Sequence, residues 1–373
     1  MITNYEDIAN RLNNFYVNLG NDLANKLPVS QNNFKFYLSK ANQPSEEINL
    51  TELSTAEIYR IIMKLPNKSS LGPDNLSNKV LKKIIKIPLV LQKLTKCINI
   101  SILEQTFPNC LKTAKISPAF KYGTLTDPSN YRPIAQLSPI SKVYEKAVMA
   151  QFSDKLEREN VLIDSQFGFR EHHSTWQPLL LTLNYIEKAI KEKKHILLIS
   201  CDLAKAFDTC QHGILNEKIK FFSKNNCLAN WIDSYYKDRE QYTLWNCEKS
   251  NTLKNFPISI VQGSSLGPKA FNLYLNDIIH CTESFSVLFA DDTNFLLSFK
   301  DHRELEKVAN KELSIIKDYF DANGLTISIQ KTSYIHFRPK GQSQKEITLA
   351  IGNETLKAVA NYTFTIVLII AHL

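Results

Sequence analysis

The sequence of 373 residues predicts an α+β fold, in which helices and strands both contribute to the core. Several segments repeat apolar residues every three or four positions, as amphipathic helices do. The run HILLISCD at 195–202 is apolar and rich in β-branched residues, which indicates a buried central strand. A second apolar stretch is interrupted by Asp291-Asp292, which predicts a hairpin with strands at Phe285–Phe289 and Asn294–Phe299.

The remaining elements follow from local patterns. Residues 30–50 are polar and predict a linker, and residues 108–133 are rich in turn residues around a short strand at Lys115–Phe120. Asp301 is expected to begin a helix that Asn323-Gly324 ends. The other helices are expected at 1–30, 55–65, 79–103, 137–156 and 176–193.

Composition limits the class of protein. Hydrophobic residues make up 43% of the chain and charged residues 22%, which is ordinary for a globular protein. The length suits two or three linked subdomains. The net charge of +8 fits a polyanionic partner, although a merely basic enzyme explains it equally well.

Cysteine usage and the chain ends indicate an intracellular protein without a membrane segment. The seven cysteines are scattered and form no Cys-x-x-Cys pair, which favours reduced thiols. Residues 1–15 lack the basic and apolar regions of a secretory signal. The apolar tail at 364–373 is shorter than the roughly 20 residues that span a bilayer as a helix.

The Asp291-Asp292 pair has two interpretations. Aspartate is common in turns, so the pair can simply connect two strands. Alternatively, two adjacent carboxylates hold a divalent cation, which offsets their repulsion. The second interpretation requires another carboxylate at the end of a buried strand, and Asp202 ends the strand at 195–202. Asp208, six residues later, caps or starts the next helix.

The segment VQGSSLGPKAFNLYLNDIIH at 261–280 predicts a loop followed by a helix. Gly263 allows close approach of the backbone, and the serines after it can cap a helix with Pro268 in its first turn. Gln262 offers both donor and acceptor groups. A plain helix start explains the segment, but this geometry also suits a nucleotide.

Nine stretches of the sequence recur in a fixed order in one family of enzymes. They are LGPDN (71–75), FPNCLKTAKISPAFKYG (107–123), NYRPIAQLSPISKVYEK (130–146), SQFGFREHHST (165–175), DLAKAFDTCQH (202–212), WIDSYYKDREQY (231–242), QGSSLGPKAFNLYLND (262–277), FADD (289–292) and ANGLTISIQKTSYIHF (322–337). With these stretches the chain resembles the reverse transcriptase domain of jockey-like non-LTR retrotransposons.

The resemblance implies a right-hand polymerase with fingers and an antiparallel palm sheet covered by helices. It divides the chain into a helical connector region at 1–49, fingers at 50–190 and a palm with the catalytic centre at 191–345. The segment 346–373 is expected to be degenerate or truncated, with the thumb missing.

The same resemblance implies RNA-directed DNA polymerase activity by two-metal-ion nucleotidyl transfer onto a primer 3′-hydroxyl. Two Mg²⁺ ions are expected at Asp202, Asp291 and Asp292, which serve as catalytic residues and metal ligands. The expected partners are an RNA template, a DNA primer and deoxynucleoside triphosphates. The alternative is a truncated, non-catalytic relic that at most binds nucleic acid, and an intron-encoded reverse transcriptase is a further alternative.

Five more residues match nucleotide-binding positions of the family. Lys121 and Arg132 are expected to contact the triphosphate, and Gln262 to lie near the sugar of the incoming nucleotide. Phe207 is expected under that sugar, and Lys331 to protonate the departing pyrophosphate. Each has an ordinary structural alternative: an exposed loop cation, a helix start, a core phenylalanine or a strand-end lysine.

Overall fold

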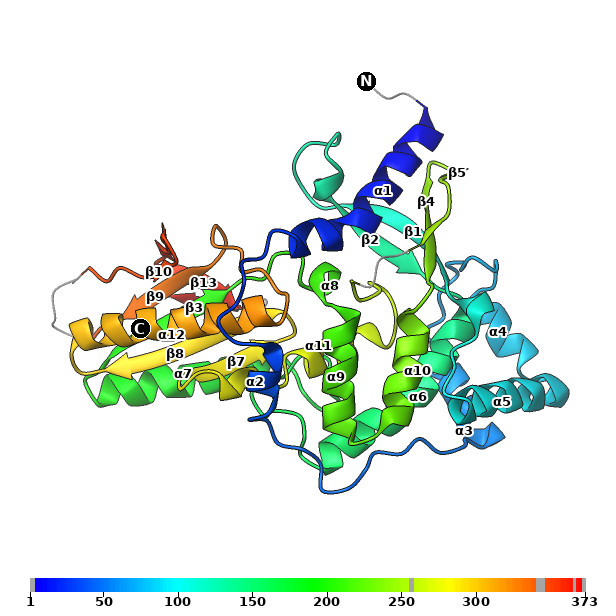
Figure 1. The fold of residues 1–373 in the computed structure, drawn as a ribbon, viewed down its shortest axis with the longest axis horizontal. Coiled ribbons are helices and arrows are strands. Elements are labelled where there is room, and N and C mark those ends of the chain that lie inside the picture. Colours follow the sequence, from blue (N-terminus) through cyan, green and yellow to red (C-terminus); the bar gives the residue numbers. More distant parts are fainter. Residues whose placement is uncertain (1–3, 255–257, 340–345, 365–366, 371–373) are drawn as a thin grey trace. The chain divides into compact units, whose positions relative to one another are not determined.

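The computed structural model describes residues 4–254, 258–339, 346–364 and 367–370, and it shows a mixed α and β fold, as predicted. The chain divides into two structural units (Figure 1). Each unit is assembled from three separate stretches of sequence. The first unit comprises residues 1–25, 42–161 and 207–270, and the second comprises residues 26–41, 162–206 and 271–373.

The first unit is built on a sheet with strand order β2-β1-β4-β5, and β6 also pairs with β4. The central strand β1 (Thr113–Phe120) is antiparallel to β2 (Tyr131–Gln136) and parallel to β4 (Glu240–Trp245). Helix α1 (Tyr5–Ala24) packs against β4. The strand predicted at Lys115–Phe120 is therefore confirmed. The short edge strands are β5 (Glu248–Lys249) and β6 (Leu253–Lys254).

Helices form the rest of the first unit. They are α3 (Thr55–Met63), α4 (Asn78–Ile84), α5 (Pro88–Leu103), α6 (Pro139–Arg158), α8 (Ala206–Thr209), α9 (His212–Ser223), α10 (Asn226–Tyr236) and the start of α11 (Gly267–Tyr274). The single helix predicted at 79–103 is wrong. Pro88 has no N–H to donate inside a helix, so α4 ends before it and α5 begins with it.

The second unit is built on the sheet β12-β9-β3-β8-β7. Its central strand β3 (His195–Cys201) is antiparallel to β8 (Asp292–Phe299) and to β9 (Ser333–Phe337). Strand β7 (Phe285–Phe289) forms the hairpin with β8. The buried strand and the hairpin predicted from the sequence are both confirmed.

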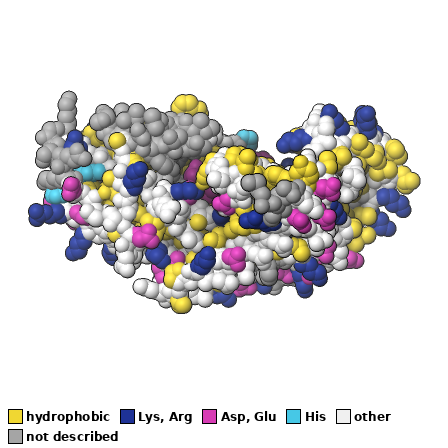
Figure 2. Space-filling view, turned by 90° about the horizontal axis from the view of Figure 1, so that it is seen from above, with side chains coloured by type: hydrophobic (Ala, Val, Ile, Leu, Met, Phe, Trp, Pro, Cys, Tyr) yellow, Lys and Arg dark blue, Asp and Glu magenta, His cyan; other side chains and the backbone are white. Residues whose placement is uncertain are grey.

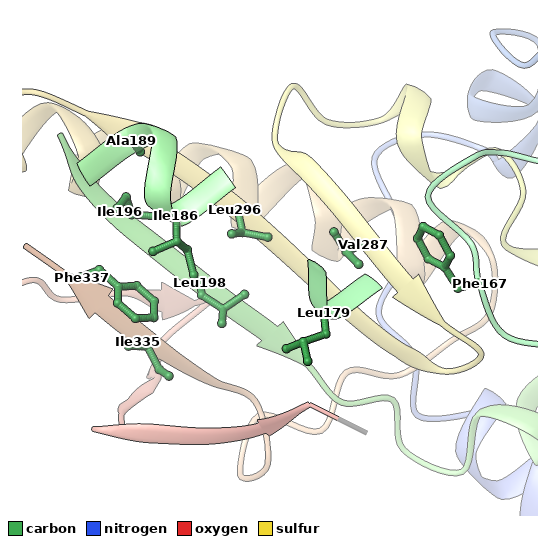
Figure 3. Packing of buried hydrophobic residues seen from close by; sticks show 10 residues of the cluster. All are labelled: Phe167, Leu179, Ile186, Ala189, Ile196, Leu198, Val287, Leu296, Ile335 and Phe337. Carbon is green, nitrogen blue, oxygen red and sulfur yellow. The ribbon is translucent and has the colours of Figure 1, made fainter. Parts of the chain in front are cut away.

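Two helices supply the core of this unit. Every residue of β3 is buried, so both faces of the sheet must be covered. Helix α7 (Trp176–Lys191) packs on the face that carries Ile196 and Leu198, and α12 (His302–Ala322) contacts β3 and β8 as well. Figure 3 shows the resulting cluster on the α7 side. Its members are Phe167, Leu179, Ile186, Ala189, Ile196, Leu198, Val287, Leu296, Ile335 and Phe337.

The remaining elements are short. They are α2 (Phe34–Leu38), the 3₁₀ turns η1 (Asn109–Leu111), η2 (Pro128–Asn130) and η3 (Ile278–His280), and the strands β10 (Ala350–Ile351), β11 (Glu354–Thr355), β12 (Lys357–Ala358), β13 (Asn361–Phe364) and β14 (Val367–Ile370).

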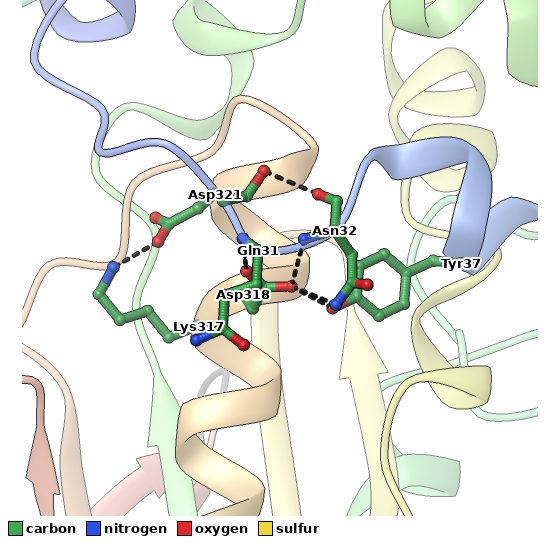
Figure 4. Close-up of polar contacts among 7 residues, drawn as sticks. Gln31, Asn32, Tyr37, Lys317, Asp318 and Asp321 are labelled. Atoms are coloured by element: carbon green, nitrogen blue, oxygen red, sulfur yellow. Dashed lines mark hydrogen bonds and ion pairs between the residues drawn. The ribbon is translucent and has the colours of Figure 1, made fainter.

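The segment predicted as a polar linker is anchored at its N-terminal end. Residues 26–41 belong to the second unit, and the Asp318 carboxylate on α12 accepts four hydrogen bonds from them (Figure 4). Tyr37 Oη donates at 2.6 Å and Asn32 Nδ2 at 2.9 Å. The backbone N–H groups of Gln31 and Asn32 donate at 2.5 and 3.2 Å. The Asp318 carboxylate thus accepts the hydrogen bonds that these groups would otherwise donate to water.

This anchor makes stability depend on pH. Burial raises the pKa of Asp318, but the hydrogen bonds from Tyr37, Asn32 and Gln31 outweigh burial and hold the pKa below its ordinary value. A lowered pKa contributes stability that is complete above about pH 4 and is lost as the pH falls through the folded-state pKa. We expect Asp318→Asn to lower the unfolding temperature by roughly 2–4 °C at pH 7.

Thermal unfolding at a series of pH values from 7 downwards checks this expectation, because the deficit should shrink as the pH falls through the lowered folded-state pKa of wild-type Asp318. Glu187→Gln is the matched control, since Glu187 forms an exposed i,i+4 pair with Lys191 that contributes little. An equal effect of both substitutions would contradict the anchor.

Candidate active site

Asp202 and Asp292 lie on neighbouring strands of the second unit. The β3–β8 ladder pairs each residue of β3 with one of β8 and ends with Cys201 opposite Thr293. Asp202 follows Cys201 directly, and Asp292 precedes Thr293 as the first residue of β8, so both lie at this end of the ladder. The register therefore brings together two of the three carboxylates singled out from the sequence.

Asp291 lies in the turn between β7 and β8. The last hairpin pair is Phe289 and Asp292, so Ala290 and Asp291 form a two-residue loop. Ala290 has a φ of 59°, in the left-handed region that a non-glycine residue seldom adopts. This backbone conformation turns the chain tightly enough to keep Asp291 within one residue of the sheet. Asp291 itself is exposed.

The charges in this cluster act on one another. Burial, together with the neighbouring charges of Asp291 and Asp202, raises the pKa of Asp292 to about 6. A carboxyl group shifted in this way lies in an excess of negative charge. The site is thus electrostatically prepared for a cation.

Lys331 lies beside Asp202, as a consequence of how the loop before β9 is held. The Ser328 N–H donates to the Asp202 carbonyl at 2.8 Å, and the Asp202 N–H donates to Thr332 Oγ1 at 3.3 Å. Lys331 Nζ lies 3.6 Å from Asp202 Oδ1. Both side chains remain partly exposed, so the pair is open to solvent and to ligands.

The donor set fits a hard divalent cation. It consists of carboxylates alone, and oxygen ligands are those that Mg²⁺ prefers. Asp202 Oδ1 is buried, and among the described residues it accepts no hydrogen bond. In the same part of the chain, however, no group of three His, Cys, Asp or Glu side chains is arranged as a finished metal site. The magnesium site therefore stays a prediction.

A segment that the sequence left without a role supports the Ala290-Asp291 turn. Gln166, in the stretch SQFGFR, accepts a hydrogen bond from the Ala290 N–H and donates one to its carbonyl. Gly168 lies so close that an added Cβ would be 2.3 Å from the Ala290 nitrogen. The glycine was the available signal, because glycine often marks a close backbone approach.

In the first unit, Lys121 and Arg132 flank one hairpin. Arg132 pairs with Ala119 across β1 and β2, and the Lys121 N–H donates to the Asn130 carbonyl at 2.9 Å. This register places the two basic side chains diagonally on the same face of the hairpin. Both are exposed, and Lys121 Nζ lies 4.9 Å from the ring centroid of Tyr122. Lys121 and Arg132 therefore lie near each other on the hairpin. Their contact with a nucleoside triphosphate stays a prediction.

Gln262 is held from both sides within the first unit. Its carbonyl accepts from the Ala135 N–H of β2 at 2.8 Å, and its Nε2 donates to Asp208 Oδ1 at 2.9 Å. Gly263 has a φ of 118°, and an added Cβ would be 2.4 Å from the Ala135 carbonyl oxygen. The close approach predicted at Gly263 is therefore to strand β2. Asp208, expected to cap or start a helix, lies within α8.

Phe207 is half-buried in α8, and its carbonyl accepts from the Ile260 N–H at 2.6 Å. Its burial fits neither a fully enclosed core residue nor a free surface residue. Both interpretations of Phe207 remain predictions.

On the face in Figure 2, Lys and Arg side chains are interspersed with acidic ones. Among the described residues, no helix combines the length and apolar character required to cross a bilayer.

Comparison with known proteins reveals relatives among mobile-element polymerases. The chain is 27% identical over 332 residues to the probable RNA-directed DNA polymerase from transposon BS of Drosophila melanogaster, covering 84% of this chain and 36% of that protein. It is 25% identical over 323 residues to the RNA-directed DNA polymerase from mobile element jockey of the same species, covering 84% and 34%.

A third relative is the retrovirus-related Pol polyprotein from type-1 retrotransposable element R1 of Bradysia coprophila, which is 25% identical over 292 residues, or 76% of this chain and 28% of that protein. The chain thus spans about a third of the length of the first two relatives. These matches confirm the predicted resemblance to the jockey-like group.

A family description gives the same assignment independently. Residues 120–357 match the family described as "Reverse transcriptase (RNA-dependent DNA polymerase)". The matched range includes all eight residues singled out above and covers more than half of the chain. The chain therefore belongs to the reverse transcriptase (RNA-dependent DNA polymerase) family.

Proposed function

We propose that this protein is an RNA-directed DNA polymerase that adds deoxynucleotides to a primer 3′-hydroxyl along an RNA template. The proposal is supported by the end of the β3–β8 ladder at Cys201 and Thr293, which are the chain neighbours of Asp202 and Asp292, and by the turn that holds Asp291 next to Asp292. The free cysteines among the described residues agree with an intracellular location.

The three carboxylates take different roles in this proposal. Asp202 and Asp291 are the principal ligands of two Mg²⁺ ions, and Asp292 contributes less directly. Bound there, Mg²⁺ supplies Lewis-acid stabilisation of the transferring phosphoryl group and lowers the pKa of the primer hydroxyl. The protein contributes fixed positions, because all three carboxylates are carried by β3 and the β7–β8 hairpin.

Lys331 is proposed to carry the proton that the departing pyrophosphate needs. Its Nζ is held near Asp202 by the same loop that bonds the Asp202 backbone, and it is accessible. An ammonium group beside the ligands of the cations can approach the leaving oxygen and donate to it.

The first unit is proposed to supply contacts to the nucleotide. Lys121 and Arg132 project from one face of the β1–β2 hairpin and suit the phosphates, since arginine binds phosphate oxygens in pairs and lysine acts as a point charge. Gln262 is proposed to bind near the sugar, and Phe207 to lie beneath it. For these four residues the proposal depends on the family resemblance more than on geometry.

The second candidate function is nucleic-acid binding without catalysis. The net charge of +8 is sufficient for such binding.

Primer extension separates the two functions. The purified protein is incubated with poly(rA)/oligo(dT), dTTP and Mg²⁺, and binding of the same template–primer is measured between low and physiological salt. The polymerase extends the primer, and EDTA stops it. Binding that falls steeply with salt, without extension in Mg²⁺ or Mn²⁺, selects the second function. If the protein neither extends the primer nor binds the template–primer, both proposed functions are contradicted.

A further inference from the structure

The segment Ser165–Phe167 extends the sheet of the second unit beyond β7. The Leu288 N–H donates to the Ser165 carbonyl at 2.8 Å, and the Phe167 N–H donates to the Leu288 carbonyl at 2.9 Å. These bonds form a parallel bridge between Gln166 and Leu288. The segment therefore runs alongside β7 towards the turn that carries Asp291.

The side chain of Gln166 then clamps that turn. Its Oε1 accepts from the Ala290 N–H at 3.0 Å and from the Gly168 N–H at 2.8 Å, and its Nε2 donates to the Ala290 carbonyl at 3.3 Å. Gln166 is 2% exposed. A glutamine amide carries both the donor and the acceptor that this double contact with Ala290 uses.

The residue that Gln166 holds is conformationally strained. Ala290 has a φ of 59°, in the left-handed region that is unfavourable for an alanine relative to the right-handed region. Such a conformation persists where the surroundings enforce it. Asp291 follows directly, so a relaxation at Ala290 redirects its carboxylate.

Hydrogen bonds from Arg170 and Asn272 hold the loop that carries Gln166. Arg170 Nη1 donates to the carbonyls of Ile163 and Gln166 at 2.8 and 3.1 Å, which closes the loop on itself. Asn272 Nδ2 donates to the Gly168 carbonyl at 2.6 Å. Because an added Cβ at Gly168 would be 2.3 Å from the Ala290 nitrogen, the two backbones can approach only with glycine there. The loop thus presents Gln166 to the turn as a rigid support.

We infer that Gln166 is a positioning residue for the proposed metal site: it holds Ala290 in the left-handed conformation and thereby directs Asp291 towards the cation. This role rests on the proposed function and deepens it. Gln166 touches neither the nucleotide nor the cation. Its contribution is to the geometry of a ligand, so its loss should weaken metal binding and catalysis more than binding of template–primer.

Gln166→Met is the test variant, because methionine keeps the volume of glutamine and removes its hydrogen bonds to Ala290. Ser284→Ala is the matched control. Ser284 is buried at the other end of β7, and its Oγ donates to Glu312 at 3.2 Å, so the control also loses a buried hydrogen bond from the same hairpin.

Three measurements compare the variants with wild type. Hydrogen exchange at the Ala290 amide should accelerate in Gln166→Met and stay unchanged in Ser284→Ala. Mn²⁺ affinity of the free protein, measured by electron paramagnetic resonance, should fall about tenfold in Gln166→Met alone. In primer extension kcat should fall roughly 10- to 100-fold, the effect of misplacing a reacting group by about 1 Å, while KM for dTTP changes little.

Equal exchange and equal Mn²⁺ affinity in wild type and Gln166→Met would overturn the inference. So would a loss of thermal stability shared by both variants without a separate effect on Mn²⁺. If wild type binds Mn²⁺ but does not extend a primer, the proposed polymerase function fails, whereas exchange at Ala290 and Mn²⁺ affinity still decide the role of Gln166. If wild type binds no Mn²⁺ at all, the positioning role is refuted.

Discussion

Asp291→Asn is expected to abolish primer extension while the protein stays folded. The substitution preserves shape and removes one of the charges that hold the proposed cations. Metal ions stabilise a transferring phosphoryl group by several kcal/mol. A loss of that size lowers the rate by roughly a thousandfold or more. The rate of extension with dTTP on poly(rA)/oligo(dT), in Mg²⁺ and then in Mn²⁺, measures this loss. Asp202→Asn is expected to lose extension to the same degree.

The thermal stability of Asp291→Asn without metal is expected to be unchanged or higher than that of wild type, although its activity is lost. In the metal-free protein Asp291 and Asp202 help burial to raise the pKa of Asp292 to about 6, so the three groups repel one another at pH 8. Removing one charge relieves this repulsion. Thermal unfolding at pH 8 without metal should therefore show an unchanged or higher midpoint for Asp291→Asn.

Asp301→Asn provides the control for both measurements. Asp301 caps α12 through hydrogen bonds from the Arg303 and Glu304 N–H groups, and asparagine caps helices equally well. Extension should survive in this variant. If Asp291→Asn instead unfolds the apo protein, the carboxylate is a structural part of the turn.

Phe207→Val is expected to admit ribonucleotides. If the ring lies beneath the sugar of the incoming nucleotide, it excludes a 2′-hydroxyl by collision, and valine leaves space for it. The ratio of deoxynucleotide to ribonucleotide incorporation should fall at least tenfold, the discrimination that about 1.4 kcal/mol provides. Extension with dTTP or UTP on the same template–primer measures the ratio.

The competing interpretation predicts a different result. A core phenylalanine loses stability when shortened, by about 3–5 kcal/mol for Phe→Ala and less for valine. Phe222→Val is the comparison, since Phe222 on α9 is fully buried in the same unit. If Phe207→Val lowers the unfolding temperature as Phe222→Val does and leaves the incorporation ratio unchanged, Phe207 is a core residue.

The sequence predicted the features that depend on neighbouring residues. The largely apolar run at 195–202 was sufficient to locate a buried strand, because such a short run rich in isoleucine and leucine is typical of one. The polar pair Asp291-Asp292 between two apolar runs was sufficient to locate the hairpin. With the hairpin and the strand located, Asp202 was the obvious third carboxylate.

Features that depend on distant residues could not be predicted in the same way. The sequence of the linker at 30–50 gave no sign of its contact with Asp318, because Asp318 lies 281 residues beyond Tyr37. Gln166 looked like any loop glutamine because its partner Ala290 lies 124 residues away. The close approach at Gly263 was foreseen, but its partner, the Ala135 carbonyl, was not. Local patterns show that a residue needs a partner and do not identify it.

The order of strands in the second unit has a consequence for synthesis of the protein. β3 is synthesised long before β9. His195 and His336, whose side chains are hydrogen-bonded, are 141 positions apart in the sequence. At translation rates of 5–20 residues per second, β3 waits roughly 7–28 s for its partner. Throughout that interval the edge of β3 that pairs with β9 is exposed, and the edge that pairs with β8 is exposed until β8 has been made, which is a hazard for aggregation. We therefore expect the newly made chain to depend on chaperones more than a protein with local strand pairing does.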